Sequence, residues 1–196
     1  PQIGRKLPTY LSIQEIDTLI AAIDRSSPKG ERDYAMVEIL YACGLRVSEL
    51  ISLKIRDIYQ SDGLIRVIGK GNKERIVPIY SKALNAINLY IKEIRNHIEV
   101  QKGFEDFVFL NRRGKAISRV YVFKRISTLA SQAGIKKKIG PHTLRHTFAT
   151  HLIQNGADIV VIQSLLGHES ITTTEIYTHL EQSHLRDTVL KFHPRS

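Results

Sequence analysis

The chain has 196 residues, 42% of them hydrophobic and 24% charged, which suits one globular domain and argues against a disordered chain. Its apolar runs are too short to cross a bilayer, and its single cysteine, Cys43, excludes an internal disulfide framework and suits the cytoplasm. The formal net charge of +10 favours a polyanionic partner, either nucleic acid or an acidic membrane surface.

The first quarter of the chain predicts helices. After Ser12, apolar residues recur with helical spacing at Ile16, Leu19, Ile20 and Ile23. Ser12 and Glu15 form a capping-box pattern, in which each side chain satisfies a free backbone N–H at the start of the helix. A second apolar stripe runs from Met36 to Cys43 and stops at Gly44, a residue type that commonly ends helices. We expect a short helix to restart at 46–50.

The middle of the chain predicts a small sheet. Residues 64–68 and 75–79 are rich in β-branched side chains, and the sequence GKGNK at 69–73 separates them. Glycines at such a turn supply the positive φ angles that a hairpin needs, so we expect a hairpin with Lys70 at its tip. Residues 55–58 predict a third strand, and Pro78 indicates that the last strand lies at an edge.

Helical spacing returns in the second half of the chain. The expected helices cover 84–98, 122–133, 142–155, 158–166, 171–178 and 181–191. We find neither an internal repeat nor a linker-like segment within the sequence. The pattern predicts one mainly α domain with a small antiparallel β-sheet, an α+β fold.

Several polar residues stand where a helical domain does not need them for packing. His142 and Arg145 lie three positions apart at an expected helix start, so they share a face near free backbone N–H groups, which favours an anion. Arg46 precedes another expected helix start, and Lys70 lies at the hairpin tip. Further along, the segment LLGH ends at His168, and Tyr177 follows nine residues later.

These residues carry a resemblance to the tyrosine recombinases and integrases, and within them to the Xer type, which resolves chromosome dimers. The similarity runs from about residue 7 to the C-terminus and rests on GLRVSEL at 44–50, GKGNKER at 69–75, HTLRH at 142–146, LGH at 166–168 and Tyr177. Each segment is weak evidence by itself, but their order and spacing together are highly specific. The resemblance implies the tyrosine recombinase catalytic-domain fold and site-specific cleavage and rejoining of DNA.

The resemblance also implies roles for individual residues. Tyr177 would attack the phosphate and form a 3′-phosphotyrosine, which conserves the bond energy for rejoining. Arg46 and Arg145 would bind the non-bridging oxygens, because their planar forks match a phosphate better than lysine does. Glu49, three residues after Arg46, would brace this site from behind.

Three further residues would complete the chemistry implied by the resemblance. His142 would shuttle the proton of the attacking tyrosine, Lys70 would protonate the departing 5′ oxygen, and His168 would donate a hydrogen bond to the phosphate. The reaction would require no metal and no nucleotide, because arginines neutralise the charge that Mg²⁺ neutralises in many nucleases.

The implied partners are double-stranded DNA at a specific recombination site and further protomers, four of which hold two duplexes in the family. The candidates for additional DNA contact are Lys73, Arg75, Lys115, Arg119, Tyr121, Lys124 and Arg125. We expect residues 1–196 to form the catalytic domain, with a linker remnant at 1–8, a C-terminal helix and tail at 181–196, and without the N-terminal DNA-clamping domain of the family. The tail could pack on its own domain or on a neighbouring protomer.

Other interpretations remain open at this stage. A mobile-element integrase would share all of these residues, and a type IB topoisomerase would share the Arg, Lys, His and Tyr chemistry. A DNA-binding fragment without an assembled active site is the non-enzymatic alternative. Four histidines, His142, His146, His151 and His168, could suggest a metal site, although no neighbouring cysteine or carboxylate completes a ligand set. A phosphate loop around Lys70 fails, because Leu64 stands where its first glycine belongs.

Overall fold

The computed structural model describes residues 8–167 and 179–196, apart from the side chains of 179–181. Eight α-helices are described: α1 (Ile13–Ala21), α2 (Pro28–Cys43), α3 (Val47–Ile51), α4 (Ser81–Glu93), α5 (Arg119–Gln132), α6 (Pro141–Gln154), α7 (Ile159–Leu166) and α8 (His179–Phe192). Three strands form the sheet: β1 (Ile58–Tyr59), β2 (Leu64–Ile68) and β3 (Glu74–Pro78). The mainly helical fold with a small antiparallel sheet is confirmed. The predicted helix at 171–178 lies outside the described residues.

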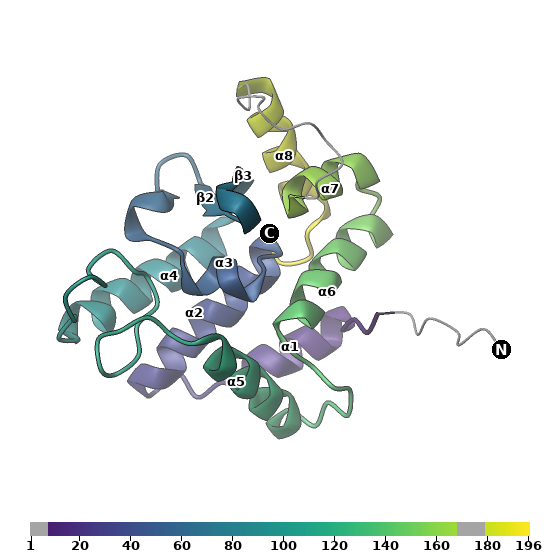
Figure 1. Cartoon of the computed structure of the whole chain (residues 1–196). Coiled ribbons are helices and arrows are strands. Elements are labelled where there is room, and N and C mark those ends of the chain that lie inside the picture. The colour runs from purple at the N-terminus through teal and green to yellow at the C-terminus, as the bar shows by residue number, and fades with distance from the viewer. Residues whose placement is uncertain (1–7, 168–178) are drawn as a thin grey trace.

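Helix α2 is the centre of the domain, with α4 on one side and α6 on the other (Figure 1). Ser27 caps its first turn by accepting a hydrogen bond from the Gly30 N–H, and Pro28 occupies the first helical position. Gly44 ends the helix in the left-handed conformation, with φ at 64°. A β-carbon at Gly44 would also clash with the ring of Phe148 on α6. Position 44 therefore requires glycine for two reasons, its left-handed backbone and its close contact with Phe148.

Two sequence predictions for the first helices are confirmed. In α1, Ser12 accepts from the Glu15 N–H while the Glu15 carboxylate accepts from the Ser12 N–H, so the capping box is formed. Helix α3 restarts directly after Arg46, as expected.

The sheet has the order β1-β2-β3 and is antiparallel throughout. The hairpin register pairs Ile65 with Val77 and Val67 with Arg75, and Pro78 lies on an edge strand as predicted. The predicted strand at 55–58 is mostly wrong. Residues 55–57 form a 3₁₀ turn and Ile58–Tyr59 form the strand, because the Ile55 N–H bonds to the Asp106 carbonyl and Arg66 on β2 holds the Asp57 carboxylate at 2.7–2.8 Å.

The C-terminal helix packs on its own domain. Helix α8 contacts β3, α6 and α7, and it buries Leu185 and Val189 (Figure 1). Beyond it, His193 donates from Nε2 to the Tyr41 carbonyl at 3.0 Å, and Arg195 pairs with Glu38 at 2.5 Å and with Asp17 at 3.0 Å. The tail is therefore attached to the central helix by polar contacts as well as by apolar packing. None of the helices in the described part of the chain has the length and apolar character that crossing a bilayer demands.

The burial of His193 makes the stability of the fold sensitive to acid. Burial is the main cause that lowers the pKa of His193 to about 4; the nearby His151 and Arg195 act in the same direction, and the hydrogen bond to Tyr41 opposes them. Between pH 6.5 and 4 the unfolded chain then binds a proton that the folded chain excludes. Stability from this residue is complete above pH 6.5 and is lost as the pH falls toward 4.

We predict that His193→Gln flattens the pH dependence of the free energy of unfolding between pH 6.5 and 4. The pKa difference corresponds to roughly 3 kcal/mol across this window in the wild type. Urea unfolding at a series of pH values measures it. If the free energy of unfolding depends on pH in the same way in both proteins, groups other than His193, such as His151 and the carboxylates, cause the acid sensitivity.

Candidate active site

The chain segment between α2 and α3 places Arg46 and Glu49 at the candidate site. Glu49 reaches back from the first turn of α3 and accepts the Arg46 N–H at 2.8 Å, while the Arg46 guanidinium lies 3.8 Å from the same carboxylate. The Arg46 side chain is 42% exposed, whereas Glu49 is buried. Glu49 thus lies behind Arg46, as expected for a brace, and leaves the guanidinium open to solvent.

Arg75 occupies a different place from the one predicted. It is 6% exposed, and its guanidinium forms a two-pronged ion pair with Glu49 while its Nε donates to the Leu165 carbonyl at 2.9 Å. These contacts use the guanidinium inside the protein, so the predicted DNA contact for Arg75 is wrong for this arrangement. The alternation of β3 explains the error, because Arg75 lies on the face of the strand that carries Val77 into the core.

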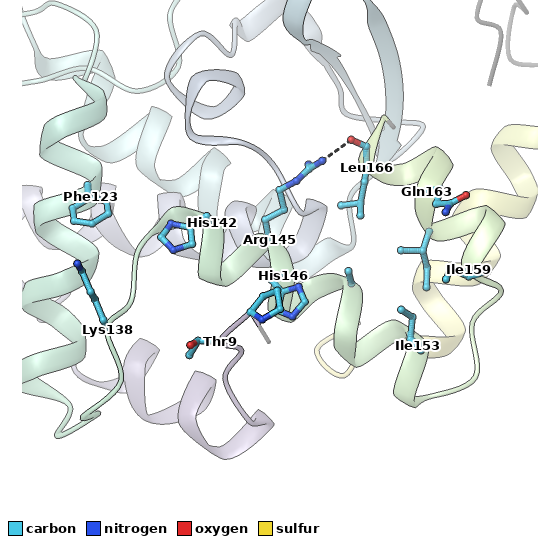
Figure 2. A pocket seen from close by; sticks show the side chains of 13 residues that line it. Thr9, Phe123, Lys138, His142, Arg145, His146, Ile153, Ile159, Gln163 and Leu166 are labelled. Carbon is cyan, nitrogen blue, oxygen red and sulfur yellow. Dashed lines mark hydrogen bonds between the residues drawn. The ribbon is translucent and has the colours of Figure 1, made fainter. Parts of the chain in front are cut away.

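Arg145, on α6, lies close to the cluster of Arg46, Glu49 and Arg75. It donates to the Gly44 carbonyl at 2.7 Å and to the Leu166 carbonyl at 2.8 Å, the second bond being drawn in Figure 2. Burial, together with the positive charges of Arg46 and Arg75, lowers the pKa of Arg145 to about 10, although the charge of Glu49 opposes the change. The group remains protonated at neutral pH. Arg46 before α3, Glu49 in α3, Arg75 in β3 and Arg145 in α6 are therefore clustered, with an excess of positive charge suited to an anion.

His142 lies one turn before Arg145, at the start of α6, and is exposed. Figure 2 shows its ring facing Phe123 of α5, and the two ring centroids are 6.5 Å apart in a stacked arrangement. Both His142 and Arg145 line an open groove of about 820 Å³. Lys138 and His146 border the same groove, whose other end is apolar and includes Ile153 and Ile159.

The hairpin approaches this cluster at the end of β2, directly before its turn. A β-carbon at Gly69 would lie 3.2 Å from the Glu49 carboxylate, so the backbone of the hairpin packs directly on that group. Lys70 follows in an exposed turn at 70–72, where Gly71 and Asn72 have φ angles of 72° and 58°. Lys73 is exposed at the end of this turn. The structure thus places Arg46 and Arg145 in one cluster, His142 one turn before Arg145, and Lys70 in the turn after Gly69. His168 and Tyr177 lie outside the described residues. The catalytic roles of all six residues stay predictions.

The residues predicted to contact DNA around α5 divide into two groups. Lys115, Arg119 and Lys124 are exposed. Tyr121 and Arg125 are partly buried, because the Tyr121 hydroxyl and the Arg125 Nε both donate to the buried carboxylate of Asp33, at 3.2 and 2.5 Å.

Asp33 and Lys138 were not singled out from the sequence. Asp33 lies within the apolar stripe of α2, and a carboxylate in such a stripe indicates a buried acid that needs a partner. The lysine run at 136–138 is a signal for Lys138. Of the histidines considered for a metal site, His151 is buried with both ring nitrogens occupied, Nδ1 by the Tyr41 hydroxyl at 2.5 Å and Nε2 by the Leu11 carbonyl at 2.7 Å.

We predict that Asp33→Asn destabilises the domain by about 3–5 kcal/mol, because it leaves the buried Arg32 and the partly buried Arg125 without their counter-charge. Asp17→Asn is the matched control. Its carboxylate also binds an arginine but is 58% exposed, so its loss costs less than about 1 kcal/mol. Urea denaturation compares the two variants, and equal losses would show that Asp33 does not anchor α5.

Comparison with known proteins identifies the family. Residues 9–184 match the model of the phage integrase family. The tyrosine recombinase XerD of Listeria monocytogenes is 46% identical over all 196 residues, and that of Halalkalibacterium halodurans is 44% identical. The chain spans about two thirds of the length of these relatives, 66% and 65%.

Solved structures show the same similarity. The XerA recombinase is 39% identical with a TM-score of 0.76, covering 100% of this chain and 68% of that one. The XerH site-specific recombinase, solved bound to a palindromic difH substrate in a post-cleavage complex, is 31% identical with a TM-score of 0.76, covering 95% of this chain and 54% of that one. The chain belongs to the phage integrase family of tyrosine recombinases, with the catalytic-domain fold of its Xer-type members.

Proposed function

We propose that this chain is the catalytic domain of a Xer-type site-specific recombinase that cleaves and rejoins DNA through a 3′-phosphotyrosine at Tyr177. The observation that carries the proposal is the meeting of Arg46 and Arg145 around one buried carboxylate, beside the hairpin that bears Lys70 and the helix start that bears His142. Residues distant in sequence gather here as a cationic site open to solvent, which suits a phosphodiester.

In the proposed reaction, the Tyr177 oxygen attacks phosphorus and the bond from phosphorus to the 5′ oxygen breaks. His142 accepts the tyrosine proton, and the Lys70 ammonium gives a proton to the departing 5′ oxygen. Arg46 and Arg145 bind the non-bridging oxygens and stabilise the charge that develops on them, with a hydrogen bond from His168. Attack by a 5′ hydroxyl on the phosphotyrosine reverses each step and reseals a strand, so neither water nor a nucleotide is consumed.

The proposed partner is double-stranded DNA carrying a specific recombination site, bound by several protomers in the cytoplasm. Support comes from the XerH neighbour, which was solved on its DNA substrate, and from the exposed basic residues Lys73, Lys115, Arg119 and Lys124. The XerD relatives favour chromosome dimer resolution over mobile-element integration. We expect tight DNA binding and complete recombination to require the part of the XerD relatives that this chain does not span.

We predict that the chain forms a denaturation-resistant covalent adduct with nicked suicide duplexes that carry candidate palindromic sites, and that Tyr177→Phe abolishes the adduct while retaining DNA binding. Gel electrophoresis under denaturing conditions detects it. Salt-dependent binding without an adduct would favour a DNA-binding fragment, and relaxation of plasmids that lack a site would favour a type IB topoisomerase activity. The absence of both adduct and binding would overturn the proposal.

The role of Lys70 can be separated from simple DNA binding. We predict that Lys70→Ala slows cleavage by roughly 10²–10⁴-fold, the usual contribution of a positioned general acid. A duplex with sulfur in place of the bridging 5′ oxygen should restore the rate, because a thiolate leaves without a proton. Lys73→Ala is the control, and its defect should be the same on both duplexes. Failure of the sulfur substrate to rescue Lys70→Ala would exclude the acid role.

A further inference from the structure

Arg75 is a buried arginine that touches three segments of the candidate site. It pairs with Glu49 at the start of α3, it donates to the Leu165 carbonyl at the end of α7, and it packs against the hairpin that carries Lys70, since a β-carbon at Gly69 would lie 3.9 Å from its Nη1. The residue itself comes from β3, the second strand of that hairpin. One side chain thus joins the segments that bear Arg46 and Lys70 and the helix that precedes His168 in sequence.

The ion pair with Arg75 determines how Glu49 interacts with Arg46. Burial by itself raises the pKa of Glu49, but the hydrogen bonds and charge of Arg75, with the Arg46 N–H, outweigh that effect and hold the pKa below its ordinary value. The carboxylate is therefore ionised, and both of its oxygens accept from Arg75. Arg46 stays 3.8 Å from Glu49, beyond hydrogen-bond range, and keeps its donors for another partner.

The contact with α7 has a counterpart in Arg145. Arg75 binds the carbonyl of Leu165 and Arg145 binds that of Leu166, so two arginines satisfy consecutive carbonyls that α7 leaves free at its C-terminus. Gly167 then takes a left-handed conformation, with φ at 71°, and a β-carbon there would lie 2.9 Å from Arg75 Cδ. Arg75 therefore holds the last turn of α7 and leaves no room for a side chain at Gly167.

We infer that Arg75 is a positioning residue of the active site: it occupies Glu49 so that Arg46 remains available to the phosphate, and it holds the end of α7 against the hairpin. This inference rests on the proposed function. Without Arg75, the ionised Glu49 would recruit the guanidinium of Arg46, the nearest cation that can swing toward it. The donors of Arg46 would then be turned away from the phosphate before DNA arrives.

The test compares Arg75→Gln and Arg75→Lys with Arg95→Gln. Arg95 is also 6% exposed and donates to the Phe107 and Glu105 carbonyls at 2.7 and 2.6 Å, but it lies on the 3₁₀ turn at 95–97, away from the cluster. In single-turnover cleavage at saturating folded protein, Arg75→Gln should slow adduct formation by roughly 10²–10³-fold, as for the loss of one preorganised donor. Its dissociation constant for DNA should stay close to that of the wild type, and Arg75→Lys should fall between the two.

Arg95→Gln should lower the melting temperature and leave the cleavage rate of the folded protein unchanged. The double variant Glu49→Gln with Arg75→Gln removes the charge that would recruit Arg46, so it should cleave faster than Arg75→Gln. If Arg75→Gln behaves as Arg95→Gln does, or if the double variant is slower than the single one, the positioning role is overturned.

A second readout does not depend on activity. Phenylglyoxal modification of Arg46, followed by peptide mass spectrometry without DNA, reports whether its guanidinium is free. We expect slower modification in Arg75→Gln, the wild-type rate in Arg95→Gln, and recovery in the double variant. An unchanged rate in Arg75→Gln would overturn the inference even if the wild type cleaves DNA. If Arg46 is modified more slowly in Arg75→Gln but the wild type forms no adduct with DNA, the positioning of Arg46 by Arg75 is upheld and the proposed function is rejected.

Discussion

The carboxylate of Glu49 is the interaction on which the arrangement of the site depends. A buried carboxylate is costly unless it is paired and hydrogen-bonded, and this one is satisfied by Arg75 and by the Arg46 N–H. Because those partners come from β3 and from the residue before α3, pairing the charge also aligns the hairpin with the helix start. The ion pair and hydrogen bonds that stabilise the buried Glu49 carboxylate therefore also position the arginines of the site.

Helix α2 distributes such contacts over the domain. Near its start, Asp33 holds Tyr121 and Arg125 of α5. Near its middle, Glu38 accepts from Arg195 in the tail, and at its end Gly44 offers its carbonyl to Arg145. A central helix that is buried on most sides needs partners for the polar side chains it carries, and each of these pairings ties a different outer element to the core. Helix α5, the tail and the candidate site are thus all attached to helix α2.

The groove beside α6 is polar at one end and apolar at the other. His142, Arg145 and Lys138 supply the polar end, where an anion gains from cations and from the free N–H groups of a helix start. Helix α8 packs against β3, α6 and α7, and His142 at the polar end of the groove is exposed in the described structure. The site therefore presents its positive charge to solvent while its supporting ion pairs stay buried.

Local rules in the sequence determined most of the elements of this protein. The capping box at Ser12 and Glu15, the glycine that ends α2 and the hairpin around Lys70 each follow from interactions between near neighbours, so they are visible without the fold. The motif residues Arg46, Lys70, His142 and Arg145 were also recognisable, because their types, order and spacing resemble those of the tyrosine recombinases. What depended on tertiary structure was the partner of each charge. Arg75 was predicted at the surface and is buried, Arg125 and Tyr121 are shared with Asp33, and the third strand is shortened by contacts of Ile55 and Asp57. These outcomes depend on residues far apart in the chain, and a charge in a sequence does not show whether water or a distant counter-charge will satisfy it.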